Sequence, residues 1–109
     1  MVEYRSPLNS TYRAISHPVR RHMLQRLSTG AARISDLAGP HEMSFAAVSK
    51  HVGVLEEAGL IKRYIKGREH WLELEASRLR LAADWLESYR HFWEGSLDRL
   101  EARLRSRGR

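Results

Sequence analysis

Residues 44–57 read SFAAVSKHVGVLEE, and this stretch decides the fold of the 109-residue chain. Val48, Val52 and Leu55 stand at the spacing of one helix face, which predicts a helix with a buried apolar stripe. The opposite face is unusual because small residues take the place of the long charged side chains that a solvated helix normally carries. That face holds Ala46, Lys50, Gly53 and Glu57, flanked by Ala47 and Ser49.

A small and slightly basic helix face suits the major groove of DNA, which admits a helix only when its leading face is unobstructed. Ala46 and Ala47 could contact thymine methyl groups, and Lys50 could reach a guanine or a phosphate. Ser49 could do either, while a helix N-terminus capped by Ser44 suits a phosphate. The alternative is that small residues simply favour helix formation on a solvated face.

The sequence on either side predicts a mainly helical domain that carries a small β-hairpin. Apolar spacing predicts short helices from about Leu8 and from Pro18, and a third at 34–39 that breaks at Gly39-Pro40. After the quoted helix the period changes to two, which is typical of a hairpin. The expected strands span about 60–65 and 70–74 around a turn at 66–69, and a long helix spans 77–107.

A group of cations lies at or near the hairpin turn, namely Lys62, Arg63, Lys66 and Arg68. Only Glu69 stands nearby to oppose them, so we expect the hairpin to contact phosphates that flank a DNA groove. The short helix at 34–39 would then cross the DNA backbone while the quoted helix enters the groove. The alternative is a charged tip that keeps an edge strand from aggregating.

Together these motifs resemble the ArsR-type family of winged helix-turn-helix transcriptional repressors. SHPVRRHMLQRL at 16–27 is similar to the opening helix of the family. ISDLAG at 34–39, followed by MSFAAVSKHVGVLEEAGLI at 43–61, matches its helix-turn-helix, and KGREHWLEL at 66–74 matches its wing. The resemblance implies a homodimer that binds a short inverted repeat in double-stranded DNA near a promoter, usually to repress transcription.

By motif position, the resemblance assigns recognition-helix roles to Ser44, Ser49, Lys50 and His51, and a wing contact to Arg68. His17 stands where the family has an aspartate, and Phe45 and Gly53 occupy sites that are usually polar or basic. The operator sequence therefore cannot be transferred from the family. His51 could contact DNA or pack within the fold, and Phe45 could contact a thymine methyl or act as a hydrophobic staple.

The long helix carries an apolar stripe that recurs about every seven residues: Leu79, Leu86, Trp93 and Leu100, with Leu97 and Leu104 beside them. Trp85, Tyr89 and Phe92 widen this stripe. A chain of this length has no spare core to cover it, so we expect a partner helix to do so. The resemblance agrees, since the family dimerises through its terminal helices. Packing against the first helix of the same chain is the alternative, and we expect both.

Composition limits the remaining possibilities. The net charge of +6 favours a polyanionic partner, and the absence of cysteine excludes disulfides and thiolate metal sites. The N-terminal residues do not resemble a secretory signal, and no apolar run is long enough for a membrane span, so we expect a cytoplasmic protein. Nothing resembles a nucleophile with its base or a phosphate-binding glycine loop, so we expect neither an enzyme nor a cofactor.

Two rival functions are a metal-responsive repressor of the same family and a winged-helix module that binds protein. Metal sensors that use the terminal helices need an Asp-x-His pair ahead of a His-x-x-His/Glu pair. His91 and Glu94 provide the second pair, but Arg78 and Arg80 stand where the first is needed. We therefore expect no metal site, and expect His91 and Glu94 to form a solvated pair. No inducer can be named from the sequence.

The sequence thus predicts a single winged helix-turn-helix domain over 1–109. Within it, we expect a DNA-binding core at 8–76, a wing at about 60–74 and a dimerisation helix at 77–107.

Overall fold

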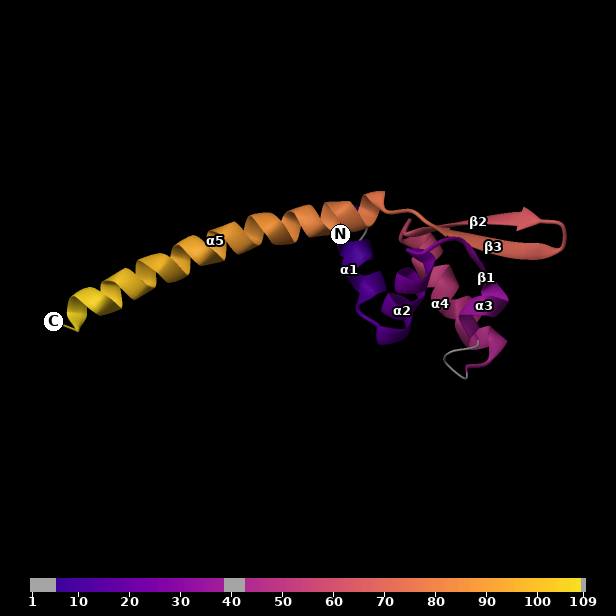
Figure 1. Ribbon diagram of the computed structural model, residues 1–109, viewed down its shortest axis with the longest axis horizontal. Helices are drawn as coiled ribbons and strands as arrows, with labels where there is room; N and C mark the ends of the chain where they lie inside the picture. The colour runs from indigo at the N-terminus through magenta and orange to yellow at the C-terminus, as the bar shows by residue number, and fades with distance from the viewer. Residues whose placement is uncertain (1–5, 39–42, 109) are drawn as a thin grey trace.

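The computed structural model describes residues 6–38 and 43–108 (Figure 1). Within these ranges the chain has a mainly helical winged helix-turn-helix fold, as the sequence predicts. The predicted break at Gly39-Pro40 lies outside the described residues, as does most of the amino-terminal tail. The elements are α1 (Pro7–Ile15), α2 (Pro18–Leu27), β1 (Ala32–Arg33), α3 (Ile34–Ala38), α4 (Phe45–Glu57), β2 (Ile61–Lys66), β3 (Glu69–Leu74) and α5 (Ser77–Arg107).

The core lies between α2, α3, α4 and the sheet. The predicted stripe of α4 is fully buried, since Val48, Val52 and Leu55 each have 0% exposure. Met23 of α2 and Leu72 of β3 are among the largest side chains that meet this stripe inside the molecule. These apolar contacts hold α4 along its length. Its opposite face is therefore fixed toward solvent.

The helix starts follow from local capping. Ser44 begins α4 by accepting a hydrogen bond from the amide of Ala47 at 3.1 Å. His17 begins α2 in the same way, because its Nδ1 accepts from the amide of Val19 at 3.1 Å. The side chain that replaces the family aspartate therefore still caps the helix. At the start of the chain, α1 includes Pro7, one residue before the expected start, because a proline fits the first turn of a helix.

The sheet has a strand that the sequence did not predict. β1 pairs antiparallel with β3, which gives a three-stranded sheet in the order β1-β3-β2. A strand of two residues is too short to show an alternating pattern, so only the hairpin was predicted. In the hairpin Lys66 pairs with Glu69, and Gly67 adopts a φ of 66° in the turn between them.

α5 gives the molecule its long shape. The helix has 31 residues and continues far beyond the body of the fold, on the side opposite the hairpin (Figure 1). The radius of gyration is 19.3 Å, whereas a compact chain of this length has about 13 Å. Only the first part of α5 packs on the body, where Ala82 is buried and Leu79 is half-buried. No described helix is both long and apolar enough to cross a membrane.

Candidate nucleic-acid interface

The outer face of α4 is exposed and unobstructed. Ala46 and Lys50 are exposed on it, and a side chain added at Gly53 would meet open space. Phe45 is 64% exposed, so it is not covered by the fold as a closed staple would be. The first turn of α4 therefore presents Ser44, Phe45 and Ala46 to solvent, with Lys50 one turn further along.

One flank of α4 faces the hairpin β2–β3, which we call the wing. A cleft of about 410 Å³ lies between the wing and helices α3 and α4. It brings together Phe45, Ser49, Arg63 and Arg68 from the predicted set. The other lining residues are Arg33, Ile34, Ser35, Glu69 and His70, which sequence reasoning did not assign to the site.

The other flank of α4 packs against the start of α2. The His51 ring lies 4.5 Å from the His17 ring, and His51 Nδ1 is 3.1 Å from Arg20 Nη1. Arg20 also donates from Nε to the carbonyl of Ala14 at 2.6 Å, at the end of α1. This is the packed arrangement that the sequence left open for His51. Ala47 is half-buried on the same flank.

The wing cations are less free than the sequence indicated. Lys62 Nζ lies 2.9 Å from Glu75, and Arg63 Nη2 lies 2.6 Å from Glu56. The expectation that only Glu69 opposes the four cations is therefore wrong, because Glu56 of α4 and Glu75, which directly follows β3, each pair with one of them. Among the described residues, Lys66 and Arg68 have no carboxylate within ion-pair distance.

These two ion pairs also shift the pKa values of their members. The hydrogen bond with Lys62 is the largest cause that lowers the pKa of the Glu75 carboxyl below its usual value. The bond with Glu56 raises the pKa of the Arg63 guanidinium. Each of the two ion pairs therefore already neutralises one cation of the wing.

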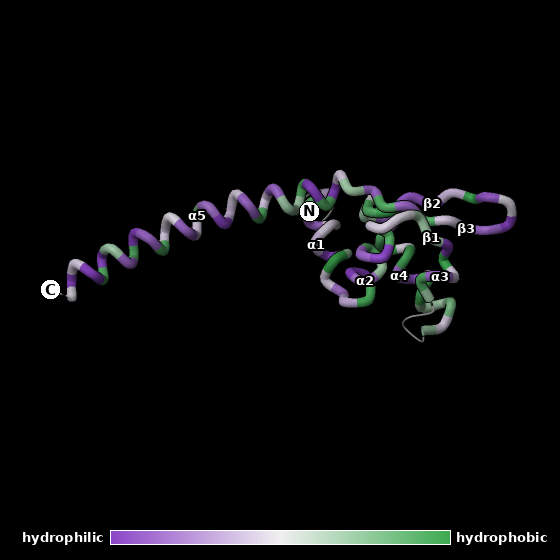
Figure 2. The backbone as a smooth tube through the Cα atoms, in the orientation of Figure 1, coloured by the Kyte–Doolittle hydropathy of each residue, from purple (hydrophilic) through white to green (hydrophobic). Residues whose placement is uncertain are grey.

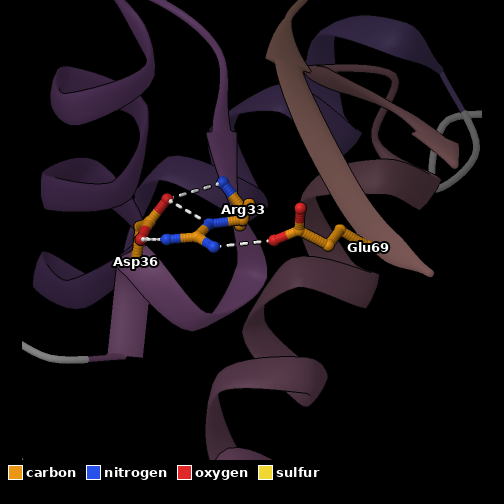
Figure 3. Close-up of polar contacts among 3 residues, drawn as sticks. All are labelled: Arg33, Asp36 and Glu69. Carbon is orange, nitrogen blue, oxygen red and sulfur yellow. Dashed lines mark hydrogen bonds and ion pairs between the residues drawn. The ribbon is translucent and has the colours of Figure 1, made fainter. Parts of the chain in front are cut away.

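An ion-pair network joins the wing to α3 (Figure 3). Arg33 donates to Asp36 from Nη2 at 3.1 Å and from Nε at 3.2 Å, and from Nη1 to Glu69 at 2.7 Å. The bond with Arg33 is the first cause that lowers the pKa of Asp36 below its usual value. The Arg33–Asp36 contact could be predicted from the sequence, because an arginine and an aspartate three positions apart are close enough to pair. Glu69 is 36 positions away from Arg33, so no local pattern predicts that contact.

The apolar stripe of α5 is exposed, as expected for a surface that needs a partner. Trp93, Leu97 and Leu100 have 46%, 55% and 49% exposure. Leu86, Tyr89 and Leu104 are exposed as well, whereas Leu79 packs on the core. Figure 2 shows apolar and polar segments alternating along the whole helix.

Packing of α5 against α1 in the same chain accounts for only its first turns. The Tyr12 hydroxyl donates to the carbonyl of Ala82 at 2.9 Å, and the Tyr12 and Trp85 rings meet edge to face. Trp85 then stacks on Tyr89 with ring centres 5.2 Å apart. The rest of the stripe, from Tyr89 onward, is exposed and makes no contact with α1 among the contacts described above.

The possible metal ligands on α5 are arranged differently from the expectation. His91 Nε2 lies 3.6 Å from Glu87, and Glu94 lies 3.9 Å from Arg90, so His91 and Glu94 do not form the expected pair. Across the described parts of the chain, no three His, Asp or Glu side chains are grouped so that they could hold a metal ion.

Comparisons with known proteins agree with this geometry. The family model described as bacterial regulatory protein, arsR family, matches residues 17–63. A crystal structure of an ArsR family transcriptional regulator has 34% sequence identity and a TM-score of 0.76, covering 82% of this chain and 98% of that one. An ArsR-like transcriptional regulator from Rhodococcus sp. RHA1 has 26% identity and a TM-score of 0.80, covering 97% of both chains. The transcriptional repressor SdpR of Bacillus subtilis is 28% identical over 82 residues, which are 75% of this chain and 91% of SdpR.

Proposed function

The chain belongs to the ArsR family of bacterial transcriptional regulators, and we propose that it represses transcription by binding an inverted-repeat operator as a homodimer. In this proposal residues 8–76 bind DNA and residues 77–107 pair the two protomers. The proposal places the protein in the cytoplasm with its DNA. Repression is favoured over activation because the relative SdpR is a repressor.

The observation that carries the DNA-binding proposal is the bare face of α4 beside the free cations of the wing. Small residues let the helix approach base edges, and Lys50 is placed to reach one. Lys66 and Arg68, which no described carboxylate neutralises, would contact phosphates beside the groove. Ser44 at the start of α4 would hold a further phosphate near the helix N-terminus.

The homodimer proposal rests on the exposed stripe of α5. A second copy of the same helix would supply a matching apolar surface, and in the proposed dimer a two-fold axis between the two helices relates two α4 helices that both face one duplex. Two-fold symmetry in the protein requires an inverted repeat in the DNA. Its half-sites should lie about 10 base pairs apart, centre to centre, so that both recognition helices meet the same side of the duplex.

Selection of duplexes from a randomised pool tests this proposal. The purified full chain should enrich an inverted repeat, and a template with that repeat across its promoter should give less transcript when the protein is added. Enrichment of a single half-site would contradict the dimer. A pool that stays random would contradict DNA recognition and favour a protein-binding module instead.

A further inference from the structure

The outer half of the wing contributes no buried side chain to the core. Residues 62–66 of β2 are exposed, and so are Glu69 and His70 of β3, although strand side chains alternate between two faces. Ile65 near the tip is 65% exposed. Burial increases toward the base of the wing, where Trp71 is half-buried and Ile61 and Leu72 join the core. Burial of apolar side chains therefore contributes little to the direction of the tip.

Ion pairs connect this part of the wing to the rest of the fold. Arg63 in β2 contacts Glu56 of α4, about midway along the hairpin. Glu69 contacts Arg33 of β1, and it does so directly beside the turn that carries Arg68. Lys62 and Glu75 join positions near the base of the hairpin and leave the tip unrestrained. Among the described residues, the Arg33–Glu69 pair is therefore the tether nearest the tip.

Arg33 is itself held in place, so it can act as a fixed point. Asp36 accepts hydrogen bonds from both the backbone amide and the side chain of Arg33. β1 also pairs Arg33 with Trp71 in register. The guanidinium is therefore anchored at the start of α3, on the helix-turn-helix, and its remaining Nη1 points to the wing (Figure 3).

We propose that Arg33 and Glu69 form a positioning pair that holds the wing tip at the distance from α4 that the operator requires. This inference rests on the proposed function. With the tether intact, Lys66 and Arg68 are already directed when α4 enters the groove, so binding does not have to order them. Without it, the cations remain but the tip can move. Specific binding should weaken, while attraction to any duplex is kept.

Simple electrostatics makes the opposite prediction. Glu69 is a negative charge at the tip of a DNA-binding element, so its removal should strengthen binding if repulsion is its only effect. Removal would also free Arg33 for a phosphate if Arg33 were a direct DNA contact. The sign of the change therefore separates a positioning pair from a repulsive or masking one.

The test compares Glu69→Ala with Glu73→Ala, using the selected operator and a random duplex of the same length. Both substitutions remove one carboxylate from β3. Glu73 is not part of the Arg33–Glu69 pair, because it lies across from Lys62 in the hairpin. Glu69→Ala should bind the operator about two- to fivefold more weakly than wild type, the size of effect expected for an exposed ion pair. Its affinity for random DNA should be unchanged or higher. Glu73→Ala should bind both duplexes at least as tightly as wild type.

A second measurement uses Arg33→Gln over a salt series. Loss of the tether alone should weaken operator binding to a similar degree as Glu69→Ala, and the double variant should be little weaker than either single one. The salt slope should stay as in wild type, because no phosphate contact is lost. Tighter operator binding by Glu69→Ala, or a slope reduced by about one unit in Arg33→Gln, would overturn the positioning role. Wild-type protein that shows no preference for any selected duplex would instead overturn the proposed function itself.

Discussion

At the scale of single residues, Lys50 is the cation that we propose to read a base. It lies on the bare face of α4, one turn beyond the capped start, and it is exposed. Neighbouring Ala46 and the open space at Gly53 leave its path to a groove clear. A long flexible donor among small residues can reach a base edge without being blocked by its neighbours.

Lys50→Ala should therefore cost about 1 to 3 kcal/mol of operator binding if Lys50 reads a guanine. Discrimination at one base pair of each half-site should weaken at the same time. Fluorescence anisotropy with the operator, single-base variants and random duplex would measure both effects. Equal losses on specific and random DNA would show that Lys50 contacts only a phosphate.

His91 provides a second residue-scale prediction, because His91 and Glu94 form half of the metal motif that sensors of the family need. Its side chain is 71% exposed and lies near Glu87, while arginines occupy both positions where the other ligands would be needed. A guanidinium has no lone pair to donate and would repel a divalent cation. Zinc at micromolar concentration should therefore neither bind stoichiometrically in calorimetry nor release the operator. Tight binding that His91→Ala abolishes would support the metal-responsive alternative.

Residue patterns predicted which side chains of α4 face solvent, but not the partners of the wing cations. Helical spacing is local, so the buried stripe of Val48, Val52 and Leu55 could be read directly from the sequence. The partner of Arg63 is Glu56, which lies on the flank of α4 that the wing approaches. The contact depends on how α4 and β2 pack against each other. The periodicity of the sequence does not predict that packing.

At the scale of elements, the wing divides its cations into paired and free ones. Lys62 and Arg63 are paired with carboxylates, whereas Lys66 and Arg68 at the tip are free of them among the described residues. The hairpin itself was predictable from its alternating pattern and its glycine turn. β1 was not, because two residues beside a helix start carry no strand signal.

Lys66→Ala and Arg68→Ala should each weaken binding to all duplexes alike. Each should also reduce the slope of log K against log salt by about one unit, since a phosphate contact releases about one counterion. Lys62→Ala is the matched control on the same strand, and it should change the slope less because Glu75 already neutralises Lys62. Gel shifts over a salt series measure this. Loss of specific binding alone in the two tip variants would mean that the tip reads bases.

At the scale of the whole molecule, α5 is the element that a single chain leaves incomplete. Its first turns cover α1, but the stripe from Tyr89 to Leu104 has no cover in the described chain. The heptad spacing predicted this stripe. The structure shows in addition that the stripe lies on a part of α5 that extends beyond the body of the fold. The coverage of 97% shared with the Rhodococcus regulator means that a likeness of fold extends over this helix as well.

Sedimentation of the Leu97→Glu, Leu100→Glu double variant, with and without operator duplex, tests the central claim that α5 pairs two protomers for DNA binding. The wild type should sediment as a dimer and bind the operator as one. The variant should be a folded monomer with little operator binding, because unpaired charges in an apolar interface are costly. A control with Asp98→Ala, on the face of the same helix that points away from the stripe, should stay dimeric and bind DNA. A double variant that remains dimeric and binds the operator as wild type does would contradict the account.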